Sequence, residues 1–285
     1  MELVRRGLAP SRERAGTEIA AGRVTVGGAP ADKASRLVGA GEAVAVAGPP
    51  ARFVSRGGDK LVAAIDTFRV PVVGADALDA GASTGGFTDC LLQLGAASVT
   101  AVDVGRGQLD ARLRADPRVT VVERTNLRHL TLEALGRPDR PYPLLTADLS
   151  FISLATVAPA LTGLAGPGAD MVVLVKPQFE AGRAAASLGR GVITDPGVWR
   201  TALAGVVGAF AATRTAMMGL MVSPLLGARG NVEFLAHLRA GGPVPAAHQG
   251  RLATAPAPDD ATDDAIDVAV AAGIALRGAV RPREA

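Results

Sequence analysis

A glycine-rich turn between two apolar runs is the segment of this chain best suited to bind a ligand. Residues 78–87 read Leu-Asp-Ala-Gly-Ala-Ser-Thr-Gly-Gly-Phe, so an apolar run closes on Asp79 and three glycines follow within eight residues. Glycine lets a backbone come close to a ligand and adopt positive φ. The order of strand, glycine-rich turn and helix predicts a ligand site at the carboxyl edge of an α/β sheet.

The spacing of these glycines argues against a pyrophosphate ligand. The dinucleotide pattern Gly-x-Gly-x-x-Gly is absent, and Phe87 stands where the Walker pattern has its lysine. Asp79 repels phosphate and suits a cationic ligand. The loop resembles motif I of S-adenosylmethionine-dependent methyltransferases, the alternative being an ordinary tight turn between a strand and a helix. The resemblance implies cofactor contacts from Asp79, Gly81, Ala82, Ser83, Gly85, Gly86 and Phe87.

Polar residues follow other strand-like runs along the chain. These runs are Ser98–Val102, Val119–Val122, Pro143–Ala147 and Met171–Val175. The first ends at Asp103, about 20 residues past the loop, where an acid binds the ribose hydroxyls of an adenosine cofactor. Thr125 and Asn126 follow the second and are expected near the adenine. Asp148 and Lys176 follow the third and fourth, so we expect them at the same edge of a parallel sheet.

Composition limits the class of protein. The chain has 285 residues, 48% of them hydrophobic, enough for a sizeable core in one or two domains. A single cysteine, Cys90, excludes an internal disulfide and suits a reducing cytoplasm. Three scattered histidines predict no metal cluster. We see no signal peptide and no run of about 18 apolar residues, so we expect a cytoplasmic protein that does not enter a membrane. The net charge of +3 permits a nucleic-acid partner without requiring one.

Residues 1–48 are predicted to form a small separate domain with short helices, a strand and a tight turn. The patterns Arg-Gly-Leu-Ala-x-Ser-Arg, Gly-Arg-Val-Thr-Val-Gly-Gly and Lys-Ala-Ser resemble the S4-type RNA-binding domain. A solvated basic helix face is the alternative. The usual Arg-x-Asp segment before the first helix is missing here. The resemblance implies that an RNA backbone faces Arg5, Arg6, Ser11, Arg12, Arg14 and Lys33.

The remaining chain divides into three further segments. Residues 49–54 read as a proline-containing linker, and residues 55–240 as the α/β domain. Residues 241–285 form a low-complexity tail, in which 241–262 read as disordered and Asp263–Arg277 as a helix.

Five motifs together resemble the TlyA family of ribosomal RNA 2′-O-methyltransferases, historically called haemolysins. They are residues 55–60 (Ser-Arg-Gly-Gly-Asp-Lys), 79–87, 148–153 (Asp-Leu-Ser-Phe-Ile-Ser), 176–180 (Lys-Pro-Gln-Phe-Glu) and 223–233. The resemblance covers residues 3–239. It implies an α/β fold, with a Rossmann-like class I methyltransferase sheet of the FtsJ type and a small α+β S4-type domain. It also implies a catalytic tetrad of Lys60, Asp148, Lys176 and Glu233.

The chemistry of methyl transfer is compatible with these four residues. A ribose 2′-hydroxyl is a poor nucleophile, so most of the catalysis should come from positioning, which supplies up to about 7–11 kcal/mol. Lys176 is the best candidate to contact the hydroxyl. To act as a base it must be neutral, a form that Lys60 and the sulfonium favour and that Asp148 and Glu233 oppose. Whether Lys176 is a base or a hydroxyl-orienting cation stays open at this stage.

The family further implies cytidine in 23S and, in some members, 16S ribosomal RNA as substrate, with a link to capreomycin-type antibiotic sensitivity. The expected partners are ribosomal RNA and ribosomal subunits, bound by a monomer. Arg56 and Arg124 either guide RNA phosphates or are solvated, and Gln178 and Glu180 either touch substrate or cap a helix. Two alternative functions are a non-catalytic RNA-binding assembly factor, which an intact tetrad disfavours, and a membrane-lytic haemolysin.

Overall fold

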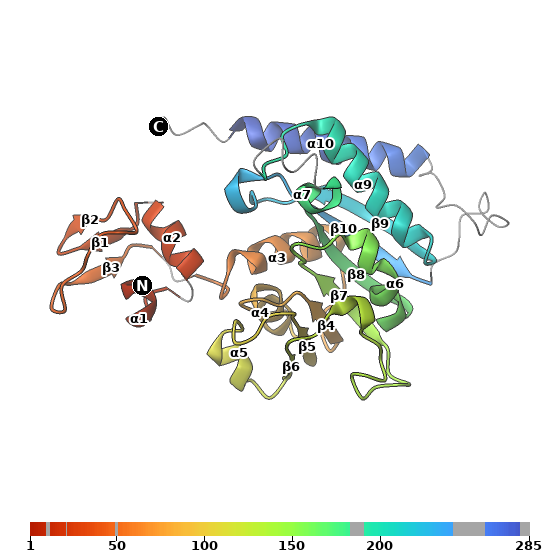
Figure 1. Ribbon diagram of the computed structural model, residues 1–285, viewed down its shortest axis with the longest axis horizontal. Helices are drawn as coiled ribbons and strands as arrows, with labels where there is room; N and C mark the ends of the chain where they lie inside the picture. The colour runs from red at the N-terminus through yellow and green to blue at the C-terminus, as the bar shows by residue number, and fades with distance from the viewer. Residues whose placement is uncertain (10–11, 21, 49–50, 183–190, 242–259, 280–285) are drawn as a thin grey trace.

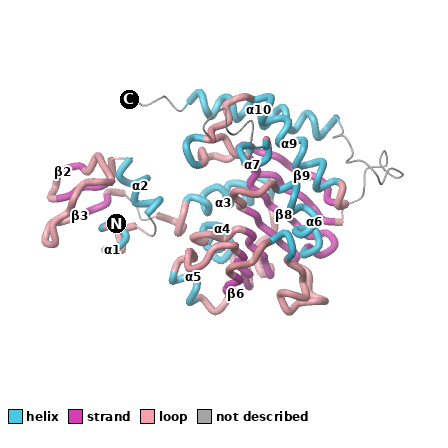
Figure 2. Tube along the Cα trace, viewed as in Figure 1, coloured by secondary structure: helices cyan, strands magenta, loops and turns pink. Residues whose placement is uncertain are grey.

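The computed structural model describes residues 1–9, 12–20, 22–48, 51–182, 191–241 and 260–279. These residues form two separate sheets, one of three strands and one of seven (Figures 1 and 2). Ser11, predicted to contact RNA, lies outside the described residues. So do residues 242–259, most of the stretch expected to be disordered.

The larger sheet carries the strand order β6-β5-β4-β7-β8-β10-β9. Its members are β4 (Asp76–Ala80), β5 (Ser98–Val102), β6 (Val119–Val122), β7 (Tyr142–Ala147), β8 (Ala165–Val175), β9 (Thr215–Val222) and β10 (Phe234–Ala240). The five strands from β6 to β8 are parallel, and β10 runs antiparallel between β8 and β9. The expected α/β fold is therefore confirmed, with a mixed rather than a purely parallel sheet.

Helices cover both faces of this sheet. One face carries α3 (Arg56–Phe68), α4 (Gly86–Gln93) and α5 (Ala111–Ala115), and the other carries α6 (Leu154–Leu164), α9 (Pro196–Ala211) and α10 (Asp260–Ala279). Along β7, Leu144 packs on the first face and Leu145 on the second, because successive strand side chains point to opposite sides. The protein is thus built of three layers with an apolar core on each side of the sheet.

The strand order changes direction between β4 and β7. From β4 the chain moves outward to β5 and β6, and then returns to the other side of β4 as β7. The helices that follow these two strands lie on opposite faces, which leaves a crevice at the carboxyl ends of the strands. Gly81 and Asp148 follow β4 and β7 directly, so both predicted motifs lie at this crevice.

The smaller sheet has the order β2-β1-β3 and its own apolar core. Its strands are β1 (Val24–Val26), β2 (Ala29–Pro30) and β3 (Val44–Val46), and helices α1 (Glu2–Arg5) and α2 (Arg12–Ala20) accompany them. Leu3, Ala15, Val24 and Val26 are buried together. All these elements fall within residues 1–48, the segment predicted to be a separate domain, whose boundaries stay a prediction.

Helix α10 extends the predicted helix 263–277 by a few residues at each end. Its buried face includes Ile266 and Gly273. A Cβ at Gly273 would lie 3.1 Å from Val232 and 3.4 Å from Phe234, so helix and strand are in close contact there. Arg200 of α9 binds Asp263 and Asp267 on α10 at 2.8 and 2.7 Å. The C-terminal helix therefore lies against the segment that carries Glu233.

Candidate active site

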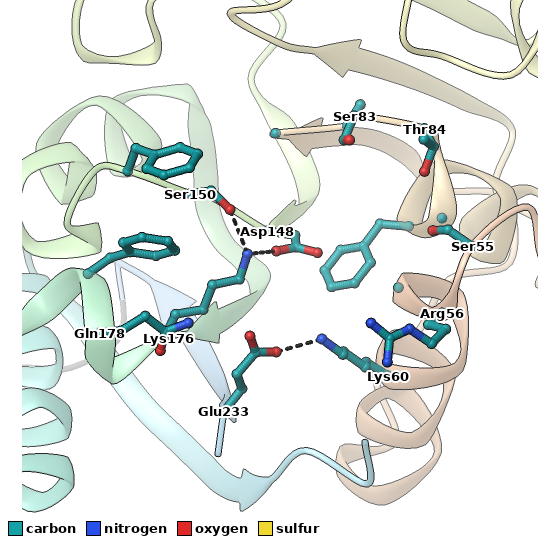
Figure 3. Close-up of a pocket in the computed structure, with 17 residues that line it drawn as sticks. Ser55, Arg56, Lys60, Ser83, Thr84, Asp148, Ser150, Lys176, Gln178 and Glu233 are labelled. Carbon is teal, nitrogen blue, oxygen red and sulfur yellow. Dashed lines mark hydrogen bonds and ion pairs between the residues drawn. The ribbon is translucent and has the colours of Figure 1, made fainter. Parts of the chain in front are cut away.

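A cavity of about 330 Å³ opens at the carboxyl ends of β4, β7 and β8 (Figure 3). The first turn of α3, the loop after β4, the turns after β7 and β8, and the segment before β10 all contribute to its wall. Its lining residues are Ser55, Arg56, Gly57, Lys60, Gly81, Ala82, Ser83, Thr84, Gly86, Phe87, Asp148, Ser150, Phe151, Lys176, Gln178, Phe179 and Glu233. All four residues of the predicted tetrad are among them.

The tetrad consists of two ion pairs. Lys60 Nζ lies 2.5 Å from Glu233 Oε2, and Lys176 Nζ lies 2.6 Å from Asp148 Oδ1. The side chains of Lys60 and Glu233 are only 9% and 3% exposed, whereas the Asp148 side chain is 25% exposed. Burying a charge is costly unless an opposite charge accompanies it. The structure therefore brings together four residues that lie far apart in the sequence, with one pair deeply buried and the other partly exposed at the cavity.

A glycine makes room for the Glu233 carboxylate. A Cβ built on Gly227 would lie 1.9 Å from Glu233 Oε1, far inside van der Waals contact. The Gly227 N–H donates to the Asn231 carbonyl at 2.8 Å, and the Ser223 N–H donates to the Glu233 carbonyl at 2.8 Å. Asn231 is itself fixed, because its amide bonds to Ile193 and Gly191. The loop before β10 thus holds Glu233 in one place.

The glycine-rich loop has the shape predicted for close approach to a ligand. Gly81 and Gly85 have φ values of 82° and 97°, which glycine alone adopts readily. A Cβ at Gly81 would lie 2.5 Å from the Asp148 carbonyl oxygen, and one at Gly86 would lie 2.2 Å from Ser55 Oγ. The loop is therefore pressed between the turn after β7 and the start of α3.

Asp79 does not lie at the end of its strand as expected. It lies inside β4, is fully buried, and accepts hydrogen bonds from Thr88 Oγ1 at 2.7 Å and Thr146 Oγ1 at 3.1 Å. Burial raises the pKa of Asp79 to about 7, although both hydroxyls oppose the rise. Asp79 is absent from the cavity wall, so it anchors α4 beneath the loop. The strand continues one residue past Asp79, to Ala80.

Asp103 lies where an acid for ribose hydroxyls is expected. Its carboxylate accepts from the N–H groups of Ser83 at 2.8 Å and Gly105 at 2.6 Å. With Ser83 it lines a second small hollow of about 10 Å³ beside the loop. The structure does not bring Thr125 and Asn126 to either hollow. The Asn126 side chain instead caps the short helix η1 (Leu127–His129) by accepting from Arg128 N–H at 3.1 Å.

The predicted RNA-binding residues differ in their surroundings. Arg12 and Lys33 are exposed, and Arg56 lines the cavity. Arg5 forms an ion pair with Glu2. Arg6 bonds to Glu2 at 2.5 Å and to the Glu42 carbonyl at 2.7 Å, so its guanidinium ties α1 to the turn before β3. The side chain of Arg14 lies outside what the structure describes.

A model of FtsJ-like methyltransferases matches residues 53–240, about two thirds of the chain. The chain belongs to the FtsJ-like methyltransferase family. A model of the S4 domain matches residues 2–44. S-adenosylmethionine, the cofactor expected from motif I, is that of this methyltransferase family.

Relatives narrow the likeness to one branch of these methyltransferases, the TlyA proteins. The chain is 51% identical to the 16S/23S rRNA (cytidine-2′-O)-methyltransferase TlyA of Mycobacterium tuberculosis over 84% of its own length and 88% of that protein. It is 32% identical to the 23S rRNA (cytidine-2′-O)-methyltransferase TlyA of Campylobacter jejuni, over 64% of this chain and 69% of that protein. A solved structure of a protein provisionally named a hemolysin, from Streptococcus thermophilus, superimposes with a TM-score of 0.72 at 35% identity, covering 95% of this chain and 94% of that one.

The residues present fit the cofactor of an FtsJ-like methyltransferase. The cavity falls in the lower part of the size range of small-molecule sites, about 300–1,000 Å³. A side chain at Gly81 would collide with the turn after β7, so the glycine-rich loop and this turn are in close contact at the floor of the cavity. The Asp103 carboxylate already accepts two hydrogen bonds, and a carboxylate has about four acceptor positions. Asp103 therefore retains capacity for ribose hydroxyls.

Several residues of this site were not predicted. Phe151 has a φ of 65° and is 92% exposed at the cavity mouth, with the Phe179 ring 5.2 Å away. Both belong to motifs recognised in the sequence, but the sequence alone does not indicate that the ring of a phenylalanine is exposed to solvent. Glu180, whose role was left open, accepts from Ser153 Oγ at 2.5 Å and Leu154 N–H at 2.8 Å, so it caps the start of α6.

Replacing Gly227 by alanine should slow turnover without impairing cofactor binding. The new methyl group would displace the Glu233 carboxylate from Lys60, and a misplacement of about 1 Å can cost roughly 100-fold in rate. We expect a 10- to 100-fold lower rate of methyl transfer, with the affinity for S-adenosylmethionine, measured by calorimetry, unchanged. Gly163→Ala, on α6 with open space around it, is the matched control. A G227A protein with normal turnover would show that the position of Glu233 is not critical.

The buried carboxyl of Asp79 should make the stability of the protein depend on pH. Its pKa rises on folding from 3.8 to about 7, so its contribution is complete below pH 4 and is lost as the pH rises through 7. Asp79→Asn removes this titration. Melting temperatures measured between pH 5 and pH 8 should therefore favour the variant increasingly at higher pH. A constant difference between the two proteins across that range would contradict the buried, protonated state.

Proposed function

We propose that this protein transfers the methyl group of S-adenosylmethionine to the 2′-hydroxyl of a cytidine in ribosomal RNA. The observation that carries the proposal is the pair of lysine–carboxylate contacts in one cavity beside the glycine-rich loop. The identity of the base and of the RNA is taken from the printed names of the TlyA relatives.

The residues of the chain position the two reactants. When bound, the cofactor supplies an electrophilic methyl carbon. Gly81 and Asp103 are proposed to hold its two ends, and Lys176 to contact the attacking hydroxyl. With the cofactor bound there, the hydroxyl oxygen would bond to that carbon as the carbon–sulfur bond breaks, with the electron pair remaining on sulfur. The hydroxyl proton leaves through Lys176 or to solvent. Asp148 keeps the Lys176 ammonium in place.

The aromatic residues at the cavity mouth suit a nucleotide turned out of its helix. Phe151 presents almost its whole ring to solvent at a strained positive φ, and Phe179 supports it. Stacking of a base on an exposed aromatic ring is worth about 1–3 kcal/mol in single-stranded RNA binding. Arg56 and the exposed cations Arg12 and Lys33 of the S4 domain are proposed to meet RNA phosphates.

The comparisons favour catalysis over the two alternative functions, a non-catalytic assembly factor and a membrane-lytic haemolysin. A non-catalytic assembly factor has no need of two lysine–carboxylate pairs in a cofactor-sized cavity. As for a membrane-lytic role, no helix among the residues that the structure describes is long and apolar enough to cross a bilayer. We propose that the protein acts as a monomer on ribosomal subunits in the cytoplasm.

Transfer of tritiated methyl groups to purified 30S subunits, 50S subunits and free ribosomal RNA tests this function. The wild-type protein should label RNA from one or both subunits, and Lys176→Ala should lower this activity at least about 100-fold, the lower end of the range for a general base. Arg118→Ala, a surface arginine paired with Asp116, serves as the control. Absence of label from wild-type protein that binds the cofactor would refute the assignment and favour a non-catalytic RNA-binding role.

A further inference from the structure

Ser150 contacts the lysine nearest the open side of the cavity. It follows Asp148 by two residues on the turn after β7, and its Oγ accepts a hydrogen bond from Lys176 Nζ at 3.0 Å (Figure 3). Leu149, between them, is buried and fixes the turn to the core. Ser150 is therefore placed by the same turn as Asp148, although no role was predicted for it.

Of its two polar partners, only Ser150 meets the Lys176 amino group with hydrogen-bond geometry. A lysine amino group rotates easily about its Cε–Nζ bond until a hydrogen bond fixes it. Here Ser150 Oγ accepts such a bond from Nζ at 3.0 Å, whereas Asp148 Oδ1 lies 2.6 Å from Nζ as an ion pair without hydrogen-bond geometry. The Phe179 ring centroid lies 5.9 Å from Nζ. The Ser150 hydrogen bond therefore fixes the directions of the other two positions on Nζ.

The directions of these two positions matter for either role of Lys176. In the charged form each carries an N–H, and one of them orients a hydroxyl oxygen. In the neutral form, with the Ser150 hydrogen bond kept, one of them carries the lone pair that accepts the hydroxyl proton. Without Ser150 no hydrogen bond fixes the rotation of the amino group, and the reactive position is aligned with substrate only part of the time.

We propose that Ser150 is a positioning residue that sets the rotation of the Lys176 amino group toward the substrate hydroxyl. The proposal rests on the proposed function of this site as a 2′-hydroxyl methyltransferase. Ser150 is not a catalytic residue in this account, because it acts through Lys176. It differs from Phe151, its neighbour, which faces solvent and has no contact with the lysine amino group among the described residues.

The first test follows single-turnover methyl transfer to the ribosomal RNA that the wild-type protein labels. Ser150→Ala should lower the rate constant at saturating cofactor and RNA about 10-fold, with both dissociation constants within two-fold of wild type. Ser150→Thr retains the hydroxyl and should restore most of the rate. Thr201→Ala, which removes an exposed hydroxyl from α9, is the control. Weaker RNA binding with an unchanged rate constant would overturn the proposal, because Ser150 would then contact the RNA.

A second test does not depend on activity. The chain has only three lysines, Lys33, Lys60 and Lys176, so nitrogen-15 labelling of lysine gives three Nζ signals. In Ser150→Ala the Lys176 amino protons should exchange with water at least several-fold faster than in wild type, while those of Lys60, sealed against Glu233, stay unchanged. Equal exchange at Lys176 in both proteins would overturn the proposal even if the wild-type protein methylates no RNA, an outcome that would separately refute the proposed function.

Discussion

The buried contact between Lys60 and Glu233 is the constraint around which this active site is organised. Neither side chain reaches solvent to more than a tenth of its surface, and either charge alone would be strongly unfavourable there. The pair joins the first turn of α3 to the segment before β10, 173 residues apart in the chain. Gly227, Asn231 and Ser223 hold the Glu233 side of the contact. Helix α10 lies behind the same segment, through Gly273.

The second pair, Lys176 with Asp148, has a different environment because it must meet substrate. Both residues follow parallel strands directly, Asp148 after β7, where the strand order changes direction, and Lys176 after the neighbouring strand β8. The glycine-rich loop follows the neighbouring strand β4. Gly81 in this loop lies so close to the Asp148 carbonyl that no side chain would fit between them. Cofactor loop and reactive lysine are thus neighbours as a direct consequence of the sheet topology. The buried pair of Lys60 and Glu233 holds the site rigid, and the partly exposed pair of Lys176 and Asp148 is accessible to substrate.

The strands could be predicted well from the sequence because apolar runs bounded by polar residues are a local signal. Val119–Val122 and Ser98–Val102 were predicted with the bounds that the structure shows. The tetrad was recognised only through resemblance to a family, since no spacing rule connects Lys60 to Glu233. The predicted position of Asp79 at the end of its strand was wrong. An acid after an apolar run usually indicates a strand end, but here hydrogen bonds from two threonine hydroxyls allow the acid to be buried within the strand.

Other features depend on contacts between distant residues and have no local signature. Asn126 reads equally as a ligand contact or a helix cap, and only the bond to Arg128 decides for the cap. Arg6 reads as a surface cation, yet its partners are Glu2 and Glu42 of the same domain. The space that Gly227 leaves for Glu233 becomes visible only when the loop before β10 is folded.

A double-mutant cycle on Lys60 and Glu233, read out as the single-turnover rate of methyl transfer, tests the central claim most directly. Lys60→Met and Glu233→Gln should each reduce the rate strongly, and the double variant should be no slower than the worse single variant, because either change already breaks the contact. Losses that multiply in the double variant would show that the two residues act independently. A single variant with the wild-type rate would show that the buried pair does not organise the site.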